Sequence, residues 1–232
     1  MIYGRGMLAT ALMSHGMPED ANFFCKGVSN SRETNLSCYS RELRELDEIL
    51  KTDDKPVYYF SSVAVDKLKD SSVYYAHKQR VENLLASSGR GRIIRLPQVI
   101  GRGGNKNNLL NYFIDTLRSG LPLKLNKFAL RNFVKATDVA HVVSSLHHDP
   151  SLWNVNKGPV EVSSPFDFCP IEIASIIAQH FQVELCYTTF EHHEGVTYDP
   201  SNFTNVVFDY NNWQPSEYLL SVISDVNVSY SK

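Results

Sequence analysis

The feature that most constrains the fold is the alternation, over the first 120 residues, of short apolar runs with longer segments of helical periodicity. The apolar runs have the length and aromatic content of buried strands, whereas the longer segments repeat apolar residues every three or four positions. The expected strands cover residues 1–3, 22–28, 55–65 and 92–99, and the expected helices cover residues 7–15, 40–51, 74–87 and 108–119. This order predicts an α/β fold, in which a parallel sheet is covered by helices on both faces.

The order of elements becomes looser after residue 120. We expect a helix after Thr137, a strand at residues 160–163, a helix at residues 170–181 and then a polar tail. The pattern predicts a single unit over residues 1–232. Residues 1–120 would form its core, and residues 121–232 would form mostly a small lobe that also returns elements to the core.

Composition excludes several classes of partner. With 43% hydrophobic residues the chain can bury a core, and with a net charge of -2 and scattered basic residues it has no field that attracts nucleic acid. No apolar run reaches the roughly 18 to 20 residues of a membrane span, and the N-terminus lacks the sections of a signal peptide. We therefore expect a cytoplasmic protein that binds neither nucleic acid nor membrane.

The cysteines and histidines do not predict a metal site. Cys25, Cys38, Cys169 and Cys186 stand far apart, without the spacing of zinc ligands, and we expect reduced, structural thiols. The adjacent pairs 147–148 and 192–193 are histidines whose side chains diverge on any regular element. Two tryptophans, Trp153 and Trp213, are expected to anchor the small lobe.

The chain opens with a glycine turn between the first strand and the first helix, Gly4-x-Gly6-x-x-Ala9. Two glycines allow a tight turn and a close approach to a pyrophosphate, and the small third residue lets the helix aim its positive N-terminus at the phosphates. Glycine-containing turns precede many helices that bind nothing, so the motif predicts a nucleotide site only in combination with others.

A second set of residues follows the third expected strand. Ser61 and Ser62 end this strand, and Tyr74-x-x-x-Lys78 begins the next helix. A spacing of four places the phenol and the ammonium on one helix face, where the ammonium would lower the pKa of the phenol toward neutrality for acid/base work. The same spacing occurs by chance in many helices, and Tyr75 is an equally good core aromatic.

Two later segments, RLPQVIGRGG at residues 95–104 and RNFVKATDVA at residues 131–140, complete an ordered set of motifs. Together with the glycine turn, the Ser-Ser strand and the Tyr-x-x-x-Lys helix, the chain resembles the NAD(P)-dependent epimerase/dehydratase family of extended short-chain dehydrogenases. Segments 154–164 and 211–219 also resemble the closing segments of that family. The resemblance implies a reduced Rossmann-like fold with a small C-terminal substrate-binding lobe.

The resemblance also implies roles for individual residues. Tyr74 would be the catalytic acid/base, Lys78 would bind the nicotinamide ribose, and Ser62 would orient the substrate oxygen. Arg131 would pair with the substrate diphosphate, and Asp138 would be a structural residue at a helix entry. The expected cofactor-binding residues are Gly4, Arg5, Gly6, Met7, Leu8, Gly27, Val28, Ser29, Ser61, Tyr74, Lys78, Pro97, Gln98 and Val99. The expected substrate-binding residues are Ser62, Val63, Gln98, Asn108 and Arg131.

The chain departs from the family pattern in composition and in length. Gln98, Ile100 and Asp66 replace the usual Asn, Tyr and Tyr of the family, so the substrate cannot be transferred from it. Only about 55 residues separate the glycine turn from Ser61, about half the usual length, which implies that a strand-helix-strand section is missing.

The missing section normally supplies the acid that binds the adenosine ribose. Glu19 and Asp20 do not replace it, because they precede a strand instead of ending one. Without that acid the main preference for NAD is lost, and Arg5 and Arg32 could meet the 2′-phosphate of NADP. We therefore expect NADP or NAD as cofactor, with a slight lean to NADP.

These patterns predict an NAD(P)-dependent oxidoreductase or epimerase that acts on a nucleotide-activated sugar, for a surface polysaccharide. By the resemblance we expect a homodimer formed through the helices at Tyr74 and Asn108. Dehydration is disfavoured because Val63 and Ala64 stand where the family's dehydratases have an Asp-Glu pair.

Two other functions stay open. A non-catalytic member of the fold could bind the cofactor or a nucleotide sugar as a sensor or assembly subunit. A reductase of a small carbonyl compound would not need Arg131. The charged run at residues 40–51 is interpreted as a solvated helix with i, i+4 ion pairs.

Overall fold

The computed structural model describes residues 1–104, 108–149, 151, 158–192 and 213–227. Its contacts form two compact units, Met1–Pro97 with Ala136–Val162, and Gln98–Lys135 with Ser163–Lys232. The sequence pattern predicts a core of residues 1–120 and a lobe at residues 121–232 that returns elements to the core. In the structure the segments of the two units interleave, and Gln98–Ile100 pairs with Arg131–Lys135 inside the second unit.

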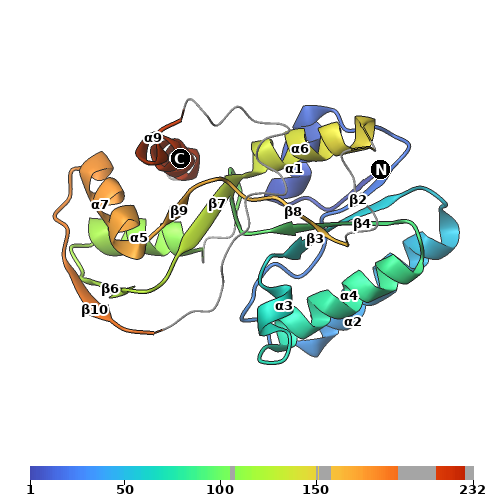
Figure 1. Ribbon diagram of the computed structural model, residues 1–232, viewed down its shortest axis with the longest axis horizontal. Coiled ribbons are helices and arrows are strands. Elements are labelled where there is room, and N and C mark those ends of the chain that lie inside the picture. The colour runs from blue at the N-terminus through green and yellow to red at the C-terminus, as the bar shows by residue number, and fades with distance from the viewer. Residues whose placement is uncertain (105–107, 150, 152–157, 193–212, 228–232) are drawn as a thin grey trace. The chain divides into compact units, whose positions relative to one another are not determined.

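The first unit is built on a parallel sheet with the strand order β1-β2-β3-β4-β8 (Figure 1). Its strands are β1 (Ile2–Tyr3), β2 (Asn22–Phe24), β3 (Val57–Ser62), β4 (Gly91–Leu96) and β8 (Val160–Glu161). β1 lies at the edge of this sheet and pairs directly with β2, with Ile2 opposite Phe23. The predicted α/β fold is confirmed, and the direct pairing agrees with the predicted loss of a strand-helix-strand section.

Helices cover both faces of this sheet. α1 (Met7–His15) packs against α6 (Ala136–His148) on one face, and α2 (Leu36–Thr52) and α4 (Val73–Ser87) lie on the other (Figure 1). The short helix α3 (Val65–Leu68) follows β3. Between sheet and helices lies an apolar cluster that includes Phe24, Leu46, Val57, Tyr59 and Leu85. Parallel strands buried on both faces explain why their sequences read as continuous apolar runs.

Helix α2 corrects the interpretation of the charged run. Asp47 and Lys51 form the expected exposed i, i+4 ion pair, with Oδ2 and Nζ 2.5 Å apart. Glu42, however, is 1% exposed and shares the buried face of the helix with Leu46 and Ile49. The prediction of a wholly solvated helix is therefore wrong at Glu42.

Among the described residues, the second unit contains two small sheets and three helices. β6 and β10 pair in parallel, β5 and β7 pair in parallel, and β9 lies antiparallel to β7. Its elements are β5 (Gln98–Ile100), α5 (Leu109–Arg118), β6 (Leu123–Asn126), β7 (Arg131–Lys135), β9 (Asp167–Phe168), α7 (Pro170–Phe181), β10 (Tyr187–Phe190) and α9 (Pro215–Asn227). Helix α7 covers residues 170–181 as predicted, because Pro170 opens it and Glu172 closes a capping box at Cys169.

Helix α9 corrects the prediction of a polar tail. Its residues Leu219, Val222 and Ile223 are fully buried in the core of the second unit. The hydroxyl of Tyr218 donates a hydrogen bond of 3.2 Å to the carbonyl oxygen of Phe133 in β7. Contacts with residues distant in the sequence thus stabilise a helix that the local sequence does not predict.

The four cysteines are free thiols. Across the described ranges, no helix is long and apolar enough to cross a membrane. Trp153, His193 and parts of segments 154–164 and 211–219 lie outside the described residues, and so do the predictions made on them. Trp213 is described, and its ring lies 6.0 Å from that of Tyr218.

Candidate cofactor and active site

The glycine turn lies at the carboxyl end of β1 and leads into α1. Gly4 has φ = +129°, and a Cβ built there would lie 3.0 Å from the backbone of Cys25, so both its conformation and its space require glycine. Gly6 is the N-cap of α1, and a Cβ at Gly6 would meet nothing within 4 Å. No side chain caps the helix at Gly6, and no acidic residue lies in its first turn. This turn therefore fits an anion such as a pyrophosphate.

Ser61 and Ser62 end β3 at the same edge of the sheet, because the strands are parallel. Among the described residues, the buried hydroxyl of Ser61 has no hydrogen-bond partner. The half-buried Ser62 accepts a hydrogen bond of 3.3 Å from the backbone N–H of Ala64. Buried hydroxyls normally have partners, so an unpaired one at this edge is suited to a bound molecule.

Tyr74 and Lys78 lie on the buried face of α4, as their spacing predicts. The Lys78 ammonium lies 5.7 Å from the centre of the Tyr74 ring. Burial is the main cause that raises the pKa of Tyr74, and the neighbouring Tyr75 and Glu42 add to it. This direction is opposite to the predicted one, since Lys78 is directed to other partners.

The partners of Lys78 are Glu42 and Tyr59, which sequence analysis did not identify. Nζ of Lys78 lies 2.8 Å from the hydroxyl of Tyr59 and 3.3 Å from Oε1 of Glu42. Tyr59 in turn donates a hydrogen bond of 2.6 Å to Glu42. The helical period could have revealed Glu42, because it stands three and seven positions from the apolar Tyr39 and Ile49 of the buried face.

A second charge cluster, with Arg95 and Glu82 buried and Asp66 exposed, fixes the segment between Ser62 and Tyr74. Arg95 in β4 donates hydrogen bonds of 3.1 and 2.7 Å to Glu82 in α4, and one of 3.1 Å to Asp66 in α3. These bonds raise the pKa of Arg95 and lower that of Asp66. Asp66, which replaces the usual Tyr of the family, thus links α3 to the sheet through its contact with Arg95.

The remaining predicted residues of the first unit differ in their exposure to solvent. Arg5 and Ser29 are exposed, Val28 and Val63 are buried, and the others are half-buried. This last group is Met7, Leu8, Gly27 and Pro97.

Four predicted residues belong to the second unit, where each has a local setting. Gln98 and Val99 are half-buried in β5. Asn108 is the N-cap of α5, and its side chain accepts a hydrogen bond of 2.8 Å from the N–H of Asn111. Arg131, at the start of β7, is half-buried and donates a hydrogen bond of 2.9 Å to the carbonyl oxygen of Leu130. Asp138 lies in the first turn of α6 in the first unit.

Of the two acidic residues before β2, Asp20 contacts a histidine through its carboxylate, and Glu19 contacts a lysine through its backbone carbonyl oxygen. Oδ1 of Asp20 lies 2.9 Å from Nε2 of His147, and the carbonyl oxygen of Glu19 accepts a hydrogen bond from Lys55. Arg32 is exposed. Among the described residues, the strand that pairs with β1 ends at Phe24 and is followed by Cys25, so no acidic residue ends it.

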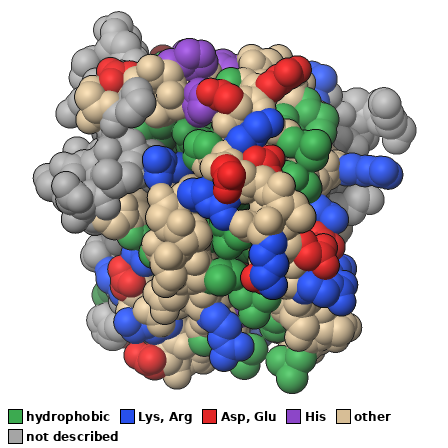
Figure 2. Space-filling view, turned by 90° about the vertical axis from the view of Figure 1, so that its right-hand side faces the viewer, with side chains coloured by type: hydrophobic (Ala, Val, Ile, Leu, Met, Phe, Trp, Pro, Cys, Tyr) green, Lys and Arg blue, Asp and Glu red, His purple; other side chains and the backbone are tan. Residues whose placement is uncertain are grey.

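Histidine side chains gather at the upper edge of the face in Figure 2. His15 and His141 lie with their ring centres 5.5 Å apart, and His147 and His148 lie 5.8 Å apart. Within the part of the chain that the structure describes, no group of three or more His, Cys, Asp or Glu side chains could hold a metal ion.

Comparison with known proteins gives matches among solved structures. No model of a protein family matches the sequence, and no curated protein matches it. The UDP-glucuronic acid 4-epimerase from Bacillus cereus, solved with UDP-glucuronic acid and NAD, superposes with a TM-score of 0.72 at 13% identity. That match covers 95% of this chain and 78% of the epimerase chain.

Two further structures match in the same way. The UDP-N-acetylglucosamine 4-epimerase from Methanobrevibacter ruminantium M1 has a TM-score of 0.65 at 18% identity, over 94% of this chain and 80% of that chain. RMD from Pseudomonas aeruginosa, complexed with NADPH, has a TM-score of 0.63 at 18% identity, over 97% of this chain and 88% of that chain.

The chain has the fold of the nucleotide-sugar epimerases. The structural likeness confirms the predicted fold class and agrees with a shortened version of it. Identities of 12 to 18% leave the reaction and its substrate to be tested on this chain itself.

Proposed function

We propose that the chain binds NADP or NAD at its glycine turn and catalyses oxidoreduction or epimerisation of a nucleotide-activated sugar. One observation carries the proposal: the glycine turn, Ser62 and the Tyr74–Lys78 helix all follow the carboxyl ends of strands in one parallel sheet. Ligands of open parallel sheets bind at this edge. In structures with the same fold, UDP-sugars and NAD are bound together.

The residues around the glycine turn fit the cofactor. Gly4 allows the positive φ and the close approach to Cys25 in the turn, and Gly6 leaves space before the uncapped N-terminus of α1, where the N–H groups would bind the pyrophosphate. The loop Gly27–Ser29 and the segment Pro97–Val99 would line the rest of its path. When bound, the nicotinamide supplies the acceptor or donor of a hydride.

Tyr74 would transfer the proton. Burial raises the pKa of Tyr74, so its phenol carries the proton that ketone reduction would transfer to the substrate oxygen. Ser62, with Val63 beside it, would orient that oxygen, and Lys78 would bind the nicotinamide ribose. Ketone reduction consumes the cofactor and epimerisation does not, so nicotinamide absorbance separates the two.

Arginines would recognise the anionic parts of cofactor and substrate. Arg5 and Arg32 are exposed and available to the 2′-phosphate, which supports the lean to NADP. Arg131, with Gln98 and Asn108, would contact the sugar nucleotide. We further propose a homodimer, cytoplasmic location and a role in surface polysaccharide synthesis, on the family resemblance.

One observation favours a second candidate, a non-catalytic member that senses a cofactor or nucleotide sugar. The Lys78 ammonium is hydrogen-bonded to Glu42 and Tyr59, with Tyr74 only in ring contact. The missing ribose-binding acid adds to this reading. An enzyme needs Tyr74 to transfer protons, whereas a sensor does not.

The test is an assay with UDP- and dTDP-sugars and their 4-keto forms, with NADPH and NADH, read by mass spectrometry and nicotinamide absorbance. We expect turnover that falls about 100-fold or more in Tyr74→Phe and stays near the native rate in Tyr75→Phe, the half-buried neighbour. Equal rates in the native protein and Tyr74→Phe would contradict the proposed role of Tyr74. Binding of a nucleotide without turnover would support the sensor.

Replacement of Arg131 by glutamate separates nucleotide sugars from small carbonyl substrates. We expect kcat/KM for a nucleotide sugar to fall about tenfold or more, because a charged partner of the diphosphate is lost. If kcat/KM is unchanged in this variant and a small carbonyl compound is the better substrate, the protein would instead be a reductase of small carbonyl compounds.

A further inference from the structure

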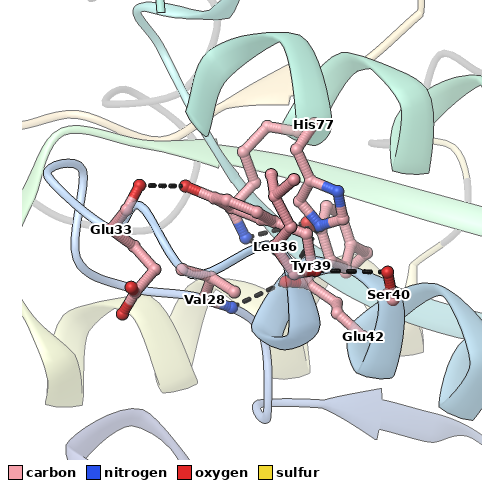
Figure 3. A network of polar contacts seen from close by, with 9 residues as sticks. Val28, Glu33, Leu36, Tyr39, Ser40, Glu42 and His77 are labelled. Atoms are coloured by element: carbon pink, nitrogen blue, oxygen red, sulfur yellow. Dashed lines mark hydrogen bonds and ion pairs between the residues drawn. The ribbon is translucent and has the colours of Figure 1, made fainter. Parts of the chain in front are cut away.

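Glu42 is the centre of a buried polar network that joins three parts of the first unit (Figure 3). Its Oε2 accepts a hydrogen bond of 2.7 Å from the backbone N–H of Val28 and lies 3.2 Å from Nε2 of His77. Its Oε1 accepts the hydroxyl of Tyr59 at 2.6 Å and lies 3.3 Å from Nζ of Lys78. One carboxylate therefore contacts the loop after β2, the strand β3 and the helix α4.

The charges in this network balance each other. Glu42 and Lys78 are 1% and 2% exposed, and a buried charge is costly unless it is paired and hydrogen-bonded. Hydrogen bonds and the Lys78 ammonium lower the pKa of Glu42 to about 2 despite its burial. Burial lowers the pKa of Lys78, and Glu42 opposes that shift. Without Glu42, the ammonium would lose its closest opposite charge.

The network also determines which residue can stand in the loop. A Cβ at Gly27 would lie 2.9 Å from Oε1 of Glu42 and 3.0 Å from Nζ of Lys78. Any side chain at Gly27 would therefore displace the ion pair. Position 27 is therefore occupied by glycine, which leaves room for the Glu42–Lys78 ion pair.

A second contact supports the network from α2. The ring of Tyr39 lies 4.6 Å from that of His77, and its hydroxyl donates a hydrogen bond of 2.8 Å to the carbonyl oxygen of Glu33. The segment that follows the loop is thus fixed to the same imidazole that contacts Glu42 (Figure 3).

We infer that Glu42 is a positioning residue that holds the Lys78 ammonium and the Gly27–Ser29 loop in one arrangement for cofactor binding. The inference rests on the proposed function, since Lys78 and this loop are proposed cofactor contacts. It assigns a role to a residue that the family motifs do not include.

Glu42→Gln tests the inference, because it keeps the size of the side chain and removes its charge. Glu48→Gln is the matched control, an exposed glutamate on the same helix. The first measurement is an NMR titration of the lysine side chains, in which Lys78→Arg assigns the signal. Other titratable groups near Lys78 are Tyr59, Tyr74, His77 and Glu82, and they are present in both variants.

We expect the pKa of Lys78 to fall in Glu42→Gln and to stay at its native value in Glu48→Gln. The dissociation constant for NADPH or NADH should rise at least about tenfold in Glu42→Gln alone, as expected when a binding group is misplaced. Native values of the Lys78 pKa and the dissociation constant in Glu42→Gln would overturn the inference. If native protein binds neither cofactor, the proposed function fails, and the Lys78 titration still reports on the Glu42 contact.

Gly27→Ala is the second variant, and it keeps every charge. We expect a shifted Lys78 signal and weaker cofactor binding from it, because the added methyl displaces the ion pair. If Glu42→Gln does not fold, Gly27→Ala tests the positioning role of Glu42 in its place. A native Lys78 signal with native binding in Gly27→Ala would overturn the inference as well.

Discussion

The two units of the chain bury different kinds of polar side chain. In the first unit the buried polar set includes four charged residues, whereas every buried polar residue described in the second unit is an asparagine or a serine. The charged residues are Glu42, Lys78, Glu82 and Arg95. The neutral residues of the second unit are Asn111, Asn126, Asn132, Ser163 and Ser164.

This difference follows from what each kind of group can do. Buried charges must be paired, and pairing fixes the position of both partners, as it does for Lys78 and for α3 through Arg95 and Asp66. Neutral amides satisfy backbone groups at lower cost. The first unit therefore uses buried ion pairs to fix its elements, and the second uses amides to fix its strands and turns.

The largest effect is expected for Arg95→Met, which removes one of the buried charges of the first unit. Removal of the guanidinium leaves Glu82 buried at 5% exposure without its partner, at a cost of about 3 to 5 kcal/mol in the free energy of unfolding. Urea unfolding measures it. Lys51→Ala, which removes the exposed pair with Asp47, is the control and should cost less than about 1 kcal/mol. Equal losses of stability in the two variants would contradict the claim that the buried charge contributes more than the exposed one.

The second effect is a dependence of stability on acid. The pKa of Glu42 is about 2 in the folded chain against 4.5 as its ordinary value, so Glu42 contributes stability above about pH 4.5 that is lost as pH falls toward 2. A shift of this size corresponds to roughly 3 kcal/mol. Urea unfolding from pH 6 to pH 3 should show a smaller loss in Glu42→Gln than in native protein. Parallel pH curves would contradict a lowered pKa.

The smallest effect is expected from loss of a buried neutral side chain in the second unit. Asn132, 1% exposed in β7, donates hydrogen bonds of 2.8 Å to the carbonyl oxygen of Ser164 and to Asp167, and accepts one of 3.0 Å from the N–H of Ser164. Asn132→Ala leaves these groups unpaired, and we expect a loss of about 1 to 3 kcal/mol. A change below 0.5 kcal/mol, taken here as about the noise of such a measurement, would show that the amide is dispensable.

Local signals account for the parts of the fold that the sequence predicted. Helix α1 is predicted at residues 7–15 by the helical spacing of its apolar residues, and in the structure Gly16 ends it in the left-handed conformation. The missing section was visible as a short distance between two motifs, and the direct pairing of β1 with β2 agrees with it.

The rest depends on partners distant in the chain. Helix α9 is held by the core of the second unit, and its periodicity is hidden in a polar segment. Glu42 reads as one of many surface glutamates, because Lys78, its countercharge, stands 36 positions later. The expected pKa shift of Tyr74 is reversed mainly by burial, and the charge of Glu42 adds to it. A spacing of four shows that two side chains share a helix face, but not what else they contact.

The central claim, that the first unit binds a nicotinamide cofactor at the glycine turn, is tested most directly by titration of the purified protein with NADPH and NADH. Nicotinamide fluorescence and thermal stability would report binding. Gly6→Asp is the decisive control, because a Cβ at Gly6 would meet nothing within 4 Å and the variant should fold, while its charge repels a phosphate. We expect binding by the native protein that is lost in Gly6→Asp. Native protein that binds neither cofactor, or a variant that binds as well as native protein, would contradict the claim.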